Sequence, residues 1–182
     1  MHERAGTIPI SLDIVSMYTN IPIDDGIQTV LEYLQRYNSN LFGLSLLNIK
    51  SLLTFMLNNN IFTFNGKYYH QISGLAMGSR IAPVIAIVML DRIERQVLQT
   101  HSYLAIKLFR RYVNDCFLLI DEKINPFDIL RRFNDSHASI KFEVKHPSTN
   151  NSLSILDVNI SLHPDGNLPQ NVMKNRLNKM SS

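Results

Sequence analysis

The pattern of apolar and polar positions predicts that the chain begins with a strand followed by two helices. Residues 7–14 form an apolar, partly β-branched run, TIPISLDI, that is typical of a strand. After a polar break, apolar residues recur at helical spacing, which predicts a helix capped by Asp24 or Asp25 and a second helix over residues 45–57. The apolar positions of the two helices are Ile27, Val30, Leu31 and Leu34, and then Leu46, Leu47, Ile49, Leu52, Leu53, Met56 and Leu57.

The middle of the chain predicts a hairpin, a loop and a long helix. The aromatic runs IFTF and KYYH flank Asn65-Gly66, which is the strongest short-range hairpin signal in the sequence. Gly74 and Gly78 bracket the loop that follows. The helix is expected to begin at residue 79 or 82 and to end at residue 99, and its pattern predicts a first half buried all round and an amphipathic second half.

The next segment predicts a second hairpin and another helix. Residues 107–120 give two apolar runs joined at Asn114-Asp115, and the pattern places these two polar residues in a tight turn. Residues 126–137 predict a helix. Its inward positions are Phe127, Ile129, Leu130 and Phe133.

The last part of the chain completes a mixed fold. Strands are expected over residues 140–145 and 153–162, whereas residues 163–182 are polar and have no core-forming period. The elements together predict one α+β domain over residues 1–162, an antiparallel sheet with helices packed on one face. Composition agrees, because 45% hydrophobic and 18% charged residues are typical of a folded domain.

Charge and cysteine content narrow the function classes. The formal net charge of +3 permits a polyanionic partner without requiring one. Basic residues cluster at Lys107, Arg110 and Arg111, at Arg131 and Arg132, and at Lys174, Arg176 and Lys179. These clusters form either positive patches or an ordinary solvated face.

Cys116 is the only cysteine, which excludes an internal disulfide and favours a reducing compartment. No apolar run approaches the ~20 residues of a membrane span, so no membrane partner is expected.

Two acidic residues suggest a place for chemistry. Asp13 lies at the tip of the first predicted strand, and Asp115 lies at the junction of the second hairpin. Carboxylates held at neighbouring strand ends suit two-metal phosphoryl transfer, because Mg²⁺ binds carboxylate oxygens together with substrate phosphates. Either acid taken alone is also a common turn-forming or helix-capping residue.

The order of motifs resembles the palm domain of reverse transcriptases from Penelope-like retroelements. SLDIVSMYTNIPIDDGI is similar to motif A, and NNNIFTFNGKYYHQISGLAMGSRIAP is similar to the hairpin and motif B. RRYVNDCFLL resembles motif C, and IKFEVKHPSTNNSLSILDVNI resembles the distal palm strands. The similarity is collinear over residues 8–162. It implies a polymerase palm with a ferredoxin-like or RRM-like core that acts on an RNA template, a DNA primer and a deoxynucleotide.

The resemblance implies a metal-binding role for the acids. Asp13 and Asp115, helped by the backbone carbonyl of Ile14, are expected to bind two Mg²⁺ ions in an active member of the family. Tyr18 is expected to lie under the incoming sugar, where its ring leaves no space for a 2′-hydroxyl; plain core packing is the alternative. The first acid of motif C is replaced here by Asn114.

The resemblance also assigns the motif B loop. Gly74 and Gly78 are expected to let the backbone approach the template base and the nucleotide, unless the segment is an ordinary flexible loop. Ser79 follows them, and Arg80 stands where the family has a proline but can still contact a phosphate. Lys141 is the candidate for protonating the leaving pyrophosphate, with an ordinary exposed lysine as the alternative.

The departures from the family pattern leave three hypotheses. An amide at Asn114 supplies no negative charge, and a loss of about 4 kcal/mol corresponds to about a thousandfold in rate. The family also has fingers, a thumb and often a GIY-YIG endonuclease, none of which fits in this chain. The chain is therefore an impaired polymerase palm, a non-catalytic nucleic-acid-binding or inert remnant, or an unrelated RRM-like module that stacks bases on Phe109, Tyr112 and Phe117. A nuclear or cytoplasmic location is expected, and secretion is not.

Overall fold

The computed structural model describes most of the chain, which forms two compact units. The described residues are 6–37, 43–100, 106–146, 152–156, 158–161 and 173–174. The first unit, here called the sheet unit, comprises Met1–Ile14, Gln99–Asp135 and Phe142–Ser182. The second, here called the helical unit, comprises Val15–Leu98 and Ser136–Lys141. The predicted boundary of one domain over residues 1–162 stays a prediction.

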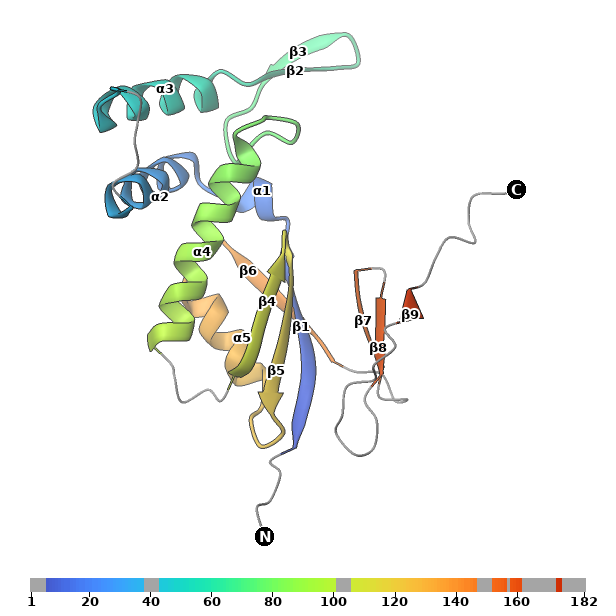
Figure 1. Cartoon of the computed structure of the whole chain (residues 1–182). Helices are drawn as coiled ribbons and strands as arrows, with labels where there is room; N and C mark the ends of the chain where they lie inside the picture. Colours follow the sequence, from blue (N-terminus) through green and yellow to red (C-terminus); the bar gives the residue numbers. More distant parts are fainter. Residues whose placement is uncertain are drawn as a thin grey trace. The chain divides into compact units, whose positions relative to one another are not determined.

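The sheet unit is built around a four-stranded sheet (Figure 1). Its strands are β1 (Thr7–Val15), β4 (Ile106–Tyr112), β5 (Asp115–Asp121) and β6 (Lys141–Lys145). They lie in the order β4-β5-β1-β6, and β5 is antiparallel to both of its neighbours. This strand order, with a helix after the first and third of these strands along the chain, is the split β-α-β arrangement of ferredoxin-like cores.

One face of this sheet carries the core of the unit. Ile10 and Leu12 of β1 are fully buried. Cys116, Leu118 and Ile120 of β5 are fully buried as well. The side chains of a strand alternate between faces, so these residues line the same face. Helix α5 (Pro126–Asp135) supplies Phe133, whose ring lies 6.0 Å from that of Phe109 and 5.1 Å from that of Phe142, measured between centroids.

Two aromatic expectations are wrong. Phe127 is exposed and contacts the ring of His146 rather than the core, because it lies two residues before Ile129, roughly 200° around the helix. Phe109 pairs with Leu118 and packs on Phe133, so it belongs to the covered face and not to an RNA-stacking surface.

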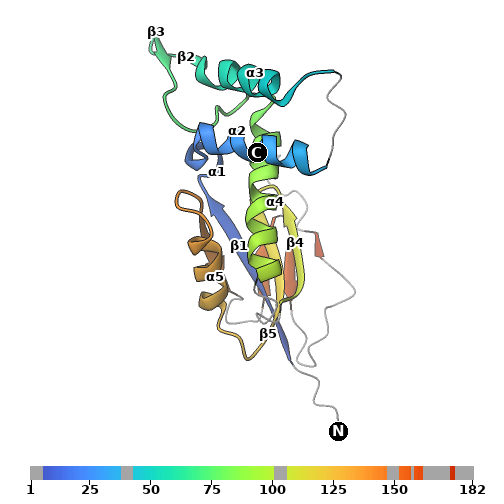
Figure 2. The same cartoon turned by 90° about the vertical axis from the view of Figure 1, so that its left-hand side faces the viewer.

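Along the chain, the helical unit contains three helices, then a hairpin, and then its longest helix. Its elements are α1 (Met17–Asn20), α2 (Ile23–Arg36), α3 (Leu46–Asn58), β2 (Ile61–Phe64), β3 (Lys67–His70) and α4 (Ala82–Thr100), whose last two residues belong to the sheet unit. Helix α2 crosses α4 closely (Figure 2). Gly26 allows this approach, because a Cβ at Gly26 would lie 2.8 Å from Cγ2 of Ile85.

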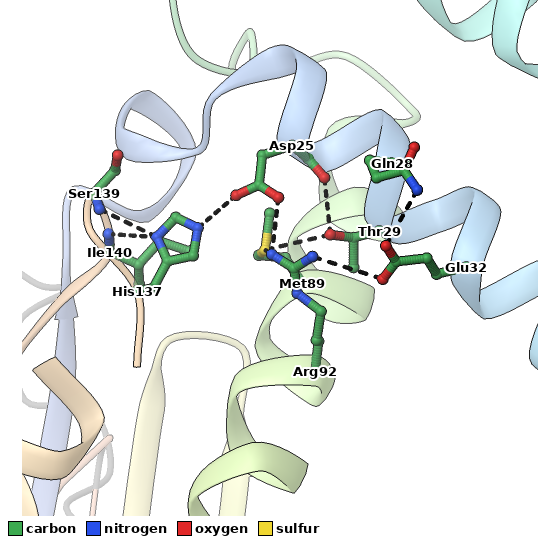
Figure 3. A network of polar contacts seen from close by, with 9 residues as sticks. All are labelled: Asp25, Gln28, Thr29, Glu32, Met89, Arg92, His137, Ser139 and Ile140. Atoms are coloured by element: carbon green, nitrogen blue, oxygen red, sulfur yellow. Dashed lines mark hydrogen bonds and ion pairs between the residues drawn. The ribbon is translucent and has the colours of Figure 1, made fainter. Parts of the chain in front are cut away.

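A polar network joins α2, α4 and the segment Ser136–Lys141 (Figure 3). Arg92 donates to Oδ1 of Asp25 at 2.8 Å, and Nε2 of His137 lies 2.6 Å from Oδ2 of the same carboxylate. Partial burial raises the pKa of Asp25, but the hydrogen bonds from His137 and Arg92 and their charges outweigh it and hold that pKa below its ordinary value. The capping prediction for α2 is wrong, because Pro22 occupies the N-cap position and Asp25 serves this network.

The two predicted hairpins form, but the second has a different turn. Asn65 and Gly66 both have positive φ values, 49° and 72°, as a two-residue type I′ turn requires. In the other hairpin Tyr112 pairs with Asp115, so the turn residues are Val113 and Asn114. The expected turn at Asn114-Asp115 is therefore wrong by one residue. Val113 adopts the left-handed conformation, with φ 54°, which a β-branched residue rarely does.

The distal segment of the sheet unit forms a hairpin instead of one strand. β7 (Ser152–Ile155) pairs with β8 (Val158–Ser161), and Leu156 turns with φ 52° between them. The single strand expected over residues 153–162 is wrong for that reason. β9 (Met173–Lys174), within the segment expected to lack core-forming structure, pairs with β8; the rest of residues 163–182 lies outside the described residues.

Helices α3 and α4 are less buried than their apolar patterns predict. Leu53 and Leu57 of α3 are buried, whereas Leu47, Leu52 and Met56 are exposed. The first half of α4 is not buried all round, because it exposes two apolar side chains. These are Val84 and Ile87.

Candidate active site

The structure brings together the two acids of the predicted site. Asp13 and Asp115 are directly opposite Cα partners on the antiparallel strands β1 and β5. Side chains of directly opposite residues lie on the same face of a sheet. Asp115 therefore faces the same side as Asp13, although it stands one residue after Asn114.

Asn114 is tied to the end of β1 through its side chain and its backbone. Its Nδ2 donates a hydrogen bond to Oδ1 of Asp13 at 3.1 Å. Its backbone carbonyl accepts a hydrogen bond from the N–H of Ile14, also at 3.1 Å. An amide donates to the carboxylate here, whereas an ionised acid in the same place only accepts. Asn114 thus reverses the hydrogen-bond polarity at this position.

Lys145 is a third member of the site. It lies on β6, the neighbour of β1, and its Nζ donates to Oδ2 of Asp13 at 3.0 Å. The hydrogen bond to Asp13 raises the pKa of Lys145, and the negative charges of Asp13, Asp115 and Glu143 act in the same direction against a smaller opposing effect of burial. The ammonium group is therefore hydrogen-bonded to Asp13 and is also stabilised by the charges of Asp115 and Glu143.

Sequence reasoning missed Lys145 and selected Lys141 instead. The alternation in KFEVK places Lys141, Glu143 and Lys145 on one face of β6, since all three are exposed. That signal does not show which strand lies beside β6. Nζ of Lys141 donates to the backbone carbonyl of His137 at 3.2 Å, so its described contact lies in the helical unit.

The side chains present do not fit a pair of Mg²⁺ ions. Both oxygens of Asp13 accept hydrogen bonds from nitrogen donors, one of them cationic. Asn114 contributes no charge, and two divalent ions need several anionic oxygens to balance them. Within the described ranges, no three or more His, Cys, Asp or Glu side chains are grouped so that they could hold a metal ion.

Tyr18 and the loop at Gly74 come together within the helical unit. The N–H of Leu75 donates to the carbonyl of Tyr18 at 2.7 Å. Gly74 has φ 74°, and a Cβ there would lie 2.6 Å from the carbonyl oxygen of Thr19. A glycine is required at this position because the loop passes directly over the backbone of α1.

The other residues of the motif B segment have simpler surroundings. Gly78 has φ 92° but open space around it, with no atom within 4 Å of an added Cβ. Oγ of Ser79 accepts a hydrogen bond from the N–H of Ile81 at 3.4 Å, just before α4 begins. Arg80 is exposed. The binding roles expected for these residues stay predictions.

Comparison with solved structures identifies the class of fold. The chain shares its fold with part of two telomerase structures, which confirms the predicted α+β architecture of an antiparallel sheet with helices. Telomerase from Candida albicans in complex with the TWJ fragment of telomeric RNA matches 91% of this chain and 30% of its own, with 14% identity and a TM-score of 0.65. The match to apo telomerase from Candida tropicalis, truncated from its C-terminal domain, covers 85% of this chain and 34% of the telomerase chain, with 13% identity and a TM-score of 0.58.

These matches establish the fold and nothing finer. The chain spans about a third of the length of the telomerase chains it matches. No family model and no curated protein matches the sequence. Among the helices that the structure describes, none has the length and apolar character needed to cross a membrane.

Proposed function

We propose that this chain is the palm part of a reverse transcriptase of the Penelope-like retroelement type. Its ligands in this proposal are an RNA template, a DNA primer and a deoxynucleotide. The observation that supports it most directly is the pairing of Asp13 with Asp115 across β1 and β5. In an active member of the family, Asp13 and Asp115 would be the residues that hold divalent ions, and those ions would supply charge neutralisation of the substrate phosphates.

The remaining residues are given positioning roles by the same proposal. Tyr18 lies under the sugar and excludes a 2′-hydroxyl. The loop at Gly74 and Gly78 presents backbone to the template base and the nucleotide, with Arg80 near a phosphate. Lys141 lies beside the leaving pyrophosphate. The hydrogen bond from the N–H of Leu75 to the carbonyl of Tyr18 supports the roles of Tyr18 and of the loop, because it holds the tyrosine and the loop next to each other.

We expect this chain itself to have weak or no polymerase activity. Asn114 removes one negative charge from the site, and Lys145 adds a positive charge against Asp13. Each change weakens the attraction for divalent ions, and electrostatic contributions of this kind amount to several kcal/mol in a transition state. The protein is proposed to act in the nucleus or cytoplasm.

A binding experiment tests the proposed ligands. The full chain is titrated with a fluorescently labelled RNA–DNA primer–template over a range of salt concentrations. Binding through phosphate contacts gives an affinity that falls linearly in a double-logarithmic plot against salt. An affinity that is absent at low salt contradicts the proposal.

A chimera tests the catalytic assignment. The chain replaces the palm of an active reverse transcriptase that supplies fingers and thumb, with either Asn114 or the substitution Asn114→Asp. Incorporation of deoxynucleotides on a primed RNA template is expected to return with Asp and to be weak with Asn. If the Asn114→Asp chimera folds, binds primer–template and still fails to incorporate, the assignment of Asp13 and Asp115 as the acids of the site is wrong.

A second candidate function is a non-catalytic nucleic-acid-binding domain or an inert remnant of a retroelement. The hydrogen bonds from Asn114 and Lys145 to Asp13 favour it, because they satisfy the acid without a metal. Salt-dependent primer–template affinity without Mg²⁺-dependent turnover favours a binding domain. The absence of affinity favours an inert remnant.

A further inference from the structure

The β2–β3 hairpin has two exposed faces, and the aromatic rings are concentrated on one of them. Its register pairs Phe62 with Tyr69 and Phe64 with Lys67. Since directly opposite residues share a face and alternate residues along a strand do too, these four side chains lie on one face, here called the aromatic face. The other face carries Ile61, Thr63, Tyr68 and His70.

The aromatic face is exposed. Phe62, Phe64 and Tyr69 are 51%, 69% and 43% accessible to solvent. The rings of Phe62 and Tyr69 stack with their centroids 5.6 Å apart and an interplanar angle of 20°. The opposite face is anchored in part, because Nε2 of His70 lies 2.6 Å from the carbonyl oxygen of Asn58 at the end of α3.

The part of the sequence that contains the hairpin carries charge of one sign. Between Glu32 and Asp91 the sequence contains no acidic residue, although it contains 15 elsewhere. The basic residues of that stretch are Arg36, Lys50, Lys67 and Arg80. Lys67 lies on the aromatic face itself, opposite Phe64. A partner of this surface is therefore expected to be anionic.

We propose that the aromatic face binds single-stranded nucleic acid by stacking bases on Phe62, Phe64 and Tyr69, with Lys67 beside a phosphate. Rings interleaved with a positive charge are the usual construction of such sites, because every base has a flat face and every nucleotide a negative charge. A bound strand also covers rings that a free two-stranded hairpin leaves in water. The inference rests on the proposed function and deepens it, because it assigns a contact for the unpaired strand outside the candidate active site.

The charge argues against a purely hydrophobic protein partner. Such a partner is favoured by an apolar patch with uncharged surroundings, whereas Lys67 lies within this face. Base stacking on one aromatic side chain commonly changes affinity about fivefold to 150-fold. Loss of one ring is therefore measurable in a binding assay.

Tryptophan substitutions provide the test, because the chain has no tryptophan of its own. Phe62→Trp and Phe64→Trp each place a single fluorophore on the aromatic face, and Tyr68→Trp is the matched control on the opposite face. A short single-stranded RNA is expected to quench the fluorescence of the first two variants strongly and that of the control weakly. The same RNA annealed to its complement is expected to quench all three weakly.

Affinity measurements give the second readout. Phe64→Ala is expected to weaken binding of the same single-stranded RNA about fivefold or more, and Tyr68→Ala less than twofold. Circular dichroism confirms that each variant is folded. Equal effects at positions 64 and 68, or equal quenching on the two faces, overturn the inference. Quenching by a hydrophobic peptide but not by RNA overturns it as well, in favour of a protein-binding surface.

The outcomes separate this inference from the proposed function. If primer–template binds with the expected salt dependence but the aromatic-face variants behave like the controls, the aromatic face is not the site and the proposed function stands. If neither primer–template nor single-stranded RNA binds, both are wrong.

Discussion

The contact between Lys145 and Asp13 predicts how metal binding can be recovered. The charged groups that act on one another at the site are the carboxylates of Asp13, Asp115 and Glu143 and the ammonium of Lys145. Asn114→Asp adds one negative charge at the hydrogen-bonding position of the amide. Lys145→Met removes the positive charge that lies 3.0 Å from Oδ2 of Asp13 while it keeps most of the side-chain volume.

The magnitude follows from Coulomb's law. A divalent ion about 4 Å from a unit charge gains about 2 kcal/mol in water, where two unit charges at that distance gain about 1 kcal/mol. Each substitution is therefore expected to tighten binding by roughly thirtyfold, and both together by roughly a thousandfold. The value for water applies because the Lys145 and Asp13 side chains are 51% and 31% exposed.

Mn²⁺ is the probe, because the electron paramagnetic resonance signal of the free ion measures its concentration directly. The wild-type chain, the two single variants and the double variant are titrated under the same conditions. The control combines Asn114→Asp with Lys107→Met, which removes a lysine that lies 3.9 Å from Asp121 on the same sheet. This control is expected to bind Mn²⁺ like Asn114→Asp alone. If the double variant binds no more tightly than Asn114→Asp, Lys145 does not compete with the ion and the reasoning is refuted.

Three further predictions concern the packing within each of the two units. Gly74→Ala is expected to lower the free energy of unfolding by about 2–5 kcal/mol, because it adds a clash with the backbone of α1 to the strain of a positive φ. Gly78→Ala is expected to cost about 1–2 kcal/mol, because only the strain applies there. Urea titrations measure both losses, and equal losses contradict the packing argument. Phe133→Ala removes a fully buried ring and is expected to cost about 3–5 kcal/mol by the same measurement, so a loss below about 1 kcal/mol shows that the α5 contact is not part of the core. Because the pKa of Asp25 is depressed in the folded state, its stabilising contribution is complete above the unfolded pKa and is lost as pH falls through the folded pKa, below about pH 4. Asp25→Asn is expected to cost about 1–2 kcal/mol at pH 7 and to flatten the acid side of the stability profile; an unchanged profile contradicts the role of the network.

Local chemistry accounts for the parts of the fold that the sequence predicted well. The Asn65-Gly66 turn requires two positive φ values and has them. The strand at residues 7–14 and the helix α4 have periodicities that few alternatives share. By contrast, Val113 takes a conformation that its own preference disfavours, and it does so because the pairing of Tyr112 with Asp115 fixes the turn at two residues. No local rule predicts that outcome.

The sequence predicts the two acids of the candidate site, because strand ends and the order of motifs can both be read from it. Asp13 and Asp115 were placed at strand ends, and their pairing follows once β1 and β5 are neighbours. Lys145 was missed because its contact depends on the position of β6 at the other side of β1. The same limit applies to α3, whose periodicity identifies an apolar surface but does not tell how much of it another element covers.

The arrangement at Asp13 has a consequence for folding without metal. Two carboxylates directly opposite each other on antiparallel strands repel and destabilise the sheet. A divalent ion relieves this repulsion where one is bound. In this chain the amide of Asn114 and the ammonium of Lys145 each donate to one oxygen of Asp13, so the relief comes from the protein itself. Asn114 and Lys145 therefore act together, because each places a hydrogen-bond donor against the carboxylate that faces Asp115 across the two strands.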